Sequence, residues 1–101
     1  MASEKKKITL FRVFRTPTQV RIIEELLKKP DEYFTLSRMA KTIGASPSAI
    51  SQRIDDLLEL NLIKFVPGSE KTKIFRLNQD SPITKALMVL YNKLRELNQK
   101  I

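Results

Sequence analysis

The sequence predicts one mainly helical domain with a small β-hairpin and a long helix at its C-terminus. Three hydroxyl–proline pairs mark helix starts. Two short runs rich in β-branched and aromatic residues flank a Pro-Gly turn, as in a hairpin. Apolar residues recur every three or four positions through the C-terminal segment. With 101 residues, the chain is long enough for one cored domain and too short for two.

The first predicted helix begins at Thr16-Pro17, where the hydroxyl caps the helix and proline occupies its first position. Gln19 stands three residues after Thr16, which completes a capping box. Pro30 ends the helix. Its core-facing residues, at helical spacing, are Val20, Ile22, Ile23, Leu26 and Leu27.

Two further helices follow a short β-prone segment at 33–36, which predicts one small strand. Ser37 is expected to cap the second helix, and Gly44 to end it in a left-handed conformation. The third helix begins at Pro47, after Ser46. Residues expected to point inward from these two helices are Met39, Ala40, Ile43, Ile50, Ile54, Leu57 and Leu58.

A hairpin is predicted directly after the third helix, which ends at Asn61, a residue that tolerates left-handed backbone. Its strands are expected at 62–66 and 73–77. The connecting segment 67–72 begins with Pro-Gly and is polar and basic. From Pro82 to the end, one long helix is expected.

Helix, short strand, helix, Gly-centred turn, helix and hairpin is the order of a winged helix-turn-helix domain. Four segments resemble the ArsR/MarR-type winged-helix transcription regulators of bacteria and archaea: RIIEELL at 21–27, FTLSRMA at 34–40, ASPSAISQRI at 45–54 and LNLI at 60–63. The resemblance covers about residues 10 to 95. It implies a DNA-binding regulator. ArsR-type metal sensors use Cys and His ligands, which this chain lacks, so metal sensing does not carry over.

The absence of His and Cys excludes metal sites built on imidazole or thiolate, Ser-His and Cys-His nucleophile pairs, and disulfides. No acid/base pair shares a predicted face either, so we expect no enzyme activity, no cofactor and no metal. No small-molecule effector can be assigned. No run approaches the ~18 apolar residues that span a bilayer, so we expect a cytoplasmic protein without a membrane role.

DNA contact is predicted at the start of the third helix, where small and polar residues allow close approach. A helix N-terminus favours a phosphate, and glutamine pairs in bidentate fashion with an adenine edge. Each residue also has a plainer interpretation, as a helix cap or as solvated surface. As a set on one face they favour contact, and they are Ser46, Ser48, Ala49, Gln52 and the flanking Arg53.

The formal net charge of +8 favours an anionic partner. Residues 31–61 nevertheless carry three basic against five acidic side chains, with Asp55, Asp56 and Glu59 in the later half of the third helix. We therefore expect only its first two turns to enter a groove. The plainer interpretation, that these carboxylates are solvated or paired with nearby lysines, is compatible with this expectation. Phosphate contacts are expected from the arm at 1–7 and from Arg38, Lys41, Lys71 and Lys73.

The C-terminal segment 81–101 is predicted to be a dimerisation helix attached to the domain at 8–80. Its apolar residues are spaced as a heptad seam: Ile83, Leu87, Leu90, Leu94, Leu97 and Ile101. We expect one side of the helix to pack on the apolar residues at 8–14 and the other on a second copy. A symmetric homodimer presents two recognition helices to an inverted repeat.

The leading functional hypothesis is thus a dimeric regulator that binds double-stranded DNA at a specific site. One alternative is an architectural or partition protein that spreads on DNA with little sequence preference. The other is a winged-helix module used for protein contact, for which the acidic residues of the third helix are the best argument.

Overall fold

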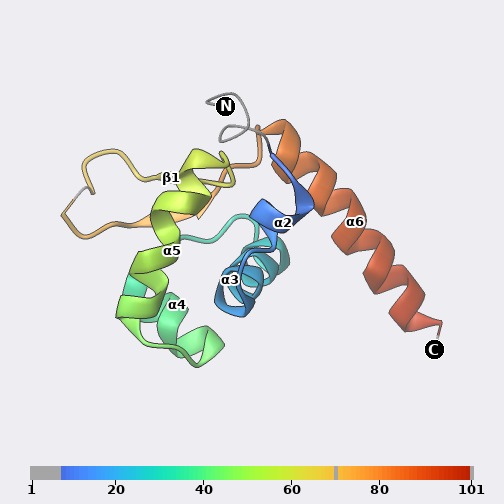
Figure 1. Ribbon diagram of the computed structural model, residues 1–101, viewed down its shortest axis with the longest axis horizontal. Coiled ribbons are helices and arrows are strands. Elements are labelled where there is room, and N and C mark those ends of the chain that lie inside the picture. Colours follow the sequence, from blue (N-terminus) through green and yellow to red (C-terminus); the bar gives the residue numbers. More distant parts are fainter. Residues whose placement is uncertain (1–7, 70, 101) are drawn as a thin grey trace.

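The computed structural model describes residues 8–69 and 71–100 and shows a mainly helical chain with one two-stranded antiparallel hairpin (Figure 1). This confirms the predicted mainly helical class with a small hairpin. The arm at 1–7 and Ile101 lie outside the described residues. The elements are α2 (Leu10–Val13), α3 (Pro17–Lys28), α4 (Leu36–Ile43), α5 (Pro47–Glu59), β1 (Ile63–Phe65), β2 (Phe75–Leu77) and α6 (Pro82–Gln99).

Hydroxyl side chains cap four of the described helices, α2 among them, where Thr9 accepts from the Arg12 N–H at 3.1 Å. Thr16 and Ser46 accept from the backbone N–H groups three residues on, at 3.1 Å each, as the sequence predicts. The predicted cap at Ser37 is wrong, because Thr35 has the extended backbone of a cap and accepts from the Arg38 N–H at 3.0 Å. Ser37 is therefore already inside the first turn. Ser81 precedes α6 without a side-chain cap hydrogen bond.

Gln19 does not complete a capping box. Its side chain is fully buried and donates from Nε2 to the carbonyl oxygens of Arg12 (3.1 Å) and Val13 (3.0 Å). Those carbonyls are at the C-terminal end of α2, where no helical N–H is available to them. The capping box is therefore only half formed. Thr16 caps α3 as predicted, but the Gln19 side chain bonds to the carbonyls of α2 instead of the Thr16 backbone N–H.

The core lies between α3, α4, α5 and the inner face of the hairpin. Gly44 ends α4 with φ +71°, and Asn61 follows α5 with φ +61°, so both predicted left-handed positions are confirmed. Leu58 is only half-buried. The largest fully buried side chains are Ile22, Leu26, Phe34, Met39, Ile50, Ile54, Leu57, Leu60, Leu62, Phe75 and Leu77, with Gln19 among them.

The hairpin is shorter than predicted. Lys73 has φ +52°, which a strand cannot accommodate, so β2 begins only at Phe75. Ser69 closes the loop by donating from its hydroxyl to the carbonyls of Val66 and Ile74. The predicted strand at 33–36 reduces to one bridge, in which Phe34 and Phe75 exchange backbone hydrogen bonds of 2.8 and 2.9 Å.

Helix α6 packs on α3 through its first half only, where Thr84 and Leu87 are buried. Its second half extends away from the body at one side of the molecule (Figure 1). The predicted cover by residues 8–14 is wrong for Leu10 and Phe11, which are exposed, whereas α3 provides the apolar surface. No described helix is both long and apolar enough to cross a membrane.

Candidate nucleic-acid interface

The N-terminal half of α5 presents a small polar surface. Ser46, Ser48 and Gln52 are exposed, while Ala49 and Arg53 are half-buried beside them. Ile50 and Ile54, on the opposite side, are fully within the core and fix the rotation of the helix. The structure therefore brings together the five residues that the sequence places at this end of the helix.

The turn between α4 and α5 sets the angle at which α5 is presented. The N–H groups of Gly44 and Ala45 both donate to the carbonyl of Ala40, which stops α4 within one residue. Arg21 of α3 lies beside this turn, with Nη2 3.9 Å from the point where a Cβ of residue 44 would stand. Arg21 is exposed. The sequence did not predict it as a site residue, because its position beside Gly44 depends on how α3 crosses α4.

Arg38, predicted as a phosphate ligand, is already engaged by its own domain. Its guanidinium donates to the Glu32 carboxylate and the Tyr33 carbonyl, and it lies 4.5 Å from the centre of the Phe34 ring. These contacts anchor the start of α4. Lys41, the other predicted cation of this helix, is exposed.

The hairpin loop carries the two predicted lysines on the side of the molecule where α4 and α5 lie (Figure 1). Lys71 is exposed and Lys73 is half-buried. The backbone of Lys73 is tied to the Ser69 carbonyl by a 2.6 Å hydrogen bond, so the loop has a defined course at this residue. The described residues on either side of Glu70 thus place two lysines in this loop.

Two more cations occupy the outer face of the hairpin. Lys64 of β1 and Arg76 of β2 are directly opposite one another, although like charges in this position disfavour strand pairing. Arg76 is held over the Tyr33 ring at 5.2 Å, with Nη1 3.3 Å from the hydroxyl, and Lys64 Nζ lies 3.9 Å from Asp80 Oδ2. The alternation of apolar and charged residues within β1 and β2 could have predicted that Lys64 and Arg76 share the outer face, but neither residue was predicted as a site residue.

The acidic half of α5 faces α2. Arg12 Nη2 lies 3.1 Å from Glu59 Oε2, and Arg12 Nε lies 4.0 Å from Asp56 Oδ1. Asp55, the third carboxylate, is exposed. The partner is an arginine of a distant helix, and only the fold shows that it is near.

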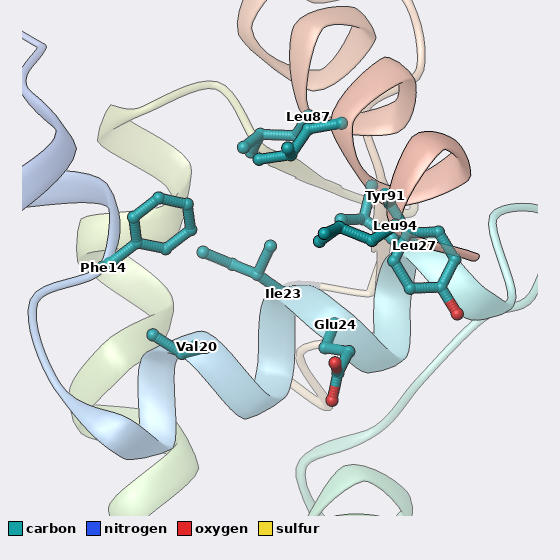
Figure 2. A pocket seen from close by; sticks show the side chains of 9 residues that line it. Phe14, Val20, Ile23, Glu24, Leu27, Leu87, Tyr91 and Leu94 are labelled. Atoms are coloured by element: carbon teal, nitrogen blue, oxygen red, sulfur yellow. The ribbon is translucent and has the colours of Figure 1, made fainter. Parts of the chain in front are cut away.

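The predicted dimer seam lies on the opposite side of the molecule, next to an apolar groove of about 150 Å³ between α3 and α6 (Figure 2). Leu87 belongs to the core of its own domain and Ile83 packs against it, whereas Leu90, Leu94 and Leu97 are 48%, 48% and 51% exposed. The groove is lined by Phe14, Val20, Ile23, Glu24, Leu27, Leu87, Leu90, Tyr91 and Leu94.

The chain thus has two distinct surfaces, one polar and basic around α5 and the hairpin, the other apolar along α6. No protein-family model, curated protein or solved structure matches it. The chemistry of these two surfaces is therefore the basis for assigning a function.

Proposed function

We propose that this protein is a winged helix-turn-helix regulator that binds double-stranded DNA as a homodimer. In this assignment α4 and α5 form the helix-turn-helix, α5 is the recognition helix and the hairpin is the wing. The observation that carries the proposal is the exposed, small and polar N-terminal half of α5, with a basic hairpin loop on the same side of the molecule.

The shape of this end of α5 supports insertion into a major groove. Serine and alanine at 46, 48 and 49 leave the backbone accessible. Pro47 has no N–H and the Ala49 N–H donates to Ser46, so of the first three helical residues it is Ser48 whose N–H is left for an approaching phosphate. Gln52 stands one turn further along, with an amide that can donate to and accept from an adenine edge. Arg53 flanks it and can reach a guanine or a phosphate.

The charge distribution also supports the proposal, although residues 31–61 are net acidic. Glu32 is paired with Arg38, and both Asp56 and Glu59 face Arg12. Three of the five carboxylates in this segment therefore lie beside an arginine. Exposed cations near the N-terminal half of α5 and in the hairpin loop remain available to phosphates: Arg21, Lys41 and Lys71.

A homodimer is proposed because α6 leaves its seam uncovered. The second half of this helix has no buried residue, and a single amphipathic helix without cover is only marginally stable in water. A second copy supplies an identical seam, so a two-fold arrangement satisfies both helices at once. Such a dimer carries two α5 helices and reads two half-sites about one turn of DNA apart.

The proposal is tested by selecting bound sequences from a randomised pool of duplex DNA with the purified protein. We expect enrichment of a short inverted repeat. Affinity for that site is then expected to fall with salt at a slope of about 0.9 per phosphate contacted. Enrichment of no motif, with extended coverage of DNA, would support the architectural alternative, whereas no binding at low salt would support the protein-contact alternative.

Gln52→Ala tests the reading role of α5 directly. Because a bidentate amide contact contributes about 1–3 kcal/mol of discrimination, we expect the preference at one base pair of each half-site to fall about tenfold or more. Gln99→Ala, at the exposed end of α6, is the matched control and should leave the selected motif unchanged. An unaltered motif in the Gln52 variant would exclude this residue from base recognition.

A further inference from the structure

Helix α2 is a single turn that depends on the rest of the domain for its position. Four residues are too few for a helix that is stable alone. Val13 anchors it in the core, and the buried Gln19 side chain holds the carbonyls of its last two residues. Arg12 provides the third attachment, on the side of α5.

The Arg12 contacts form a clamp between α2 and the second half of α5. Arg12 has a side chain only 21% exposed and reaches Glu59 at 3.1 Å and Asp56 at 4.0 Å. The Asp56 side chain is 13% exposed, so one carboxylate of this cluster is largely withdrawn from water. A carboxylate in that position is stabilised by a cation close by.

The other face of α2 is apolar and uncovered. Leu10 is 76% and Phe11 79% exposed, and Phe14, just beyond the helix, lines the groove between α3 and α6. Large apolar side chains gathered in this way indicate a contact surface. Leu10 and Phe11 precede Phe14 by four and three residues, which places them on its side of the helical turn. Phe14 in turn lines the groove together with Leu90 and Leu94 of α6.

We propose that α2 is a docking element for a second copy of this chain, and that the clamp from Arg12 to Asp56 and Glu59 holds it in the docking orientation. The occupant is a second copy because the α2 surface adjoins the α6 seam, which is self-complementary under two-fold symmetry. A net charge of +8 on each chain opposes association, so apolar contact must provide the attraction. This inference rests on the proposed dimer and extends its interface to α2.

The clamp gives the acidic half of α5 a role in assembly. The same helix then carries DNA-reading residues in its first turns and anchors the dimer surface through its last turns. Any shift of α2 on docking is transmitted to α5 through Arg12. Dimer formation and the presentation of the recognition helix are thereby physically connected.

The first test compares Glu59→Gln with Asp55→Asn by sedimentation equilibrium without DNA. Both changes remove one negative charge from the same helix, but Asp55 is not part of the clamp. We expect the dimer dissociation constant to rise about fivefold in the Glu59 variant, since exposed pairs are individually weak and each dimer contains two clamps. The Asp55 variant should dimerise at least as well as the wild type.

Arg12→Gln should weaken the dimer at least as much as Glu59→Gln, because it also removes the contact with Asp56. The double variant should be no weaker than Arg12→Gln alone, because Glu59 has then already lost its partner. Phe11→Ser tests the docking surface itself and should weaken the dimer more, with the clamp intact. If Phe11→Ser and Glu59→Gln both dimerise like the wild type, the inference is wrong.

DNA affinity gives a readout of opposite sign. If Glu59 only repelled phosphates, its neutralisation would strengthen DNA binding at every protein concentration. The clamp predicts the reverse, a loss of affinity below the dimer dissociation constant that disappears at high protein concentration. A wild-type protein that dimerises but does not bind DNA would overturn the proposed function and leave the clamp standing. A wild type that binds DNA, with a Glu59 variant that dimerises normally and binds DNA more tightly, would overturn the clamp alone.

Discussion

Single residues with left-handed backbone determine how α5 is held at both of its ends. Gly44 bends the chain before α5, and Asn61 turns it into β1. Glycine enters this region without a steric cost, and asparagine enters it at a lower cost than other side chains. The angle of the proposed recognition helix therefore depends on two residues outside the predicted set of DNA contacts.

Gly44→Ala is expected to destabilise the fold by about 1–2 kcal/mol, the cost of placing an alanine in left-handed backbone. Steric overlap adds little, because the nearest atom to the new Cβ is Arg21 Nη2 at 3.9 Å. Gly44→Asn is the matched variant and should lose clearly less. The measurement is the free energy of unfolding in urea. Equal losses for alanine and asparagine would show that packing, and not backbone conformation, determines the cost.

Local rules predict the residues whose partners are close in the chain. Thr16, Ser46 and Gly44 behave as their neighbours dictate. The same rules misplace the cap of α4, because Thr35 and Ser37 both carry a hydroxyl that could cap a helix. The bridge from Phe34 to Phe75 keeps the backbone extended up to Thr35, so Thr35 becomes the cap. Gln19 is beyond such rules, since its partners belong to another helix.

At the scale of elements, the helices follow from periodicity, whereas the hairpin and the ends of the chain depend on tertiary contacts. Lys73 shortens β2 because it adopts left-handed backbone, which a β-prone sequence does not reveal. Helix α6 covers α3, because the two apolar stripes meet there and residues 10–13 form a separate turn of helix. The sequence alone could predict the candidate contact residues on α5. The positions of Arg21, Arg12 and the Lys64–Arg76 pair relative to them depend on how the elements pack.

Lys73→Asn separates the charge of the proposed wing from its conformation. Asparagine tolerates the φ of +52° at this position, so the free energy of unfolding should change little. We expect DNA affinity to fall and the salt slope to decrease by about 0.9 for each phosphate that is no longer neutralised, twice that for a dimer. Lys85→Asn, exposed on α6, is the control and should leave the slope unchanged. An unchanged slope in the Lys73 variant would remove this lysine from the interface.

At the scale of the whole molecule, the two surfaces are on opposite sides. The hairpin loop and α5 are on one side and α6 is on the other (Figure 1). A partner bound along α6 would therefore leave the N-terminal half of α5 and the hairpin loop of each copy accessible to DNA. In the proposed dimer the formal charge of the two full chains is twice +8, which we expect to strengthen attraction to DNA and to make it strongly dependent on salt.

This separation makes Leu94→Glu a test of the assembly that spares the fold. Leu94 is 48% exposed and lies in the half of α6 that has no buried residue, so the core around α3, α4 and α5 should stay folded without urea. The urea midpoint should fall only by the stability that dimerisation contributes. A carboxylate at a two-fold interface must lose water without a partner, which should convert the protein to a monomer in sedimentation.

The monomer keeps one α5 and one wing, so its DNA binding should fall to that of a half-site, with about half the salt slope. Gln99→Glu adds the same charge to the same helix at an exposed polar position and should change neither property. A Leu94 variant that stays dimeric and keeps the full slope would place the interface elsewhere. A monomer that keeps the full affinity for the inverted repeat would instead show that one copy suffices, because the contacts of the second half-site would then contribute nothing.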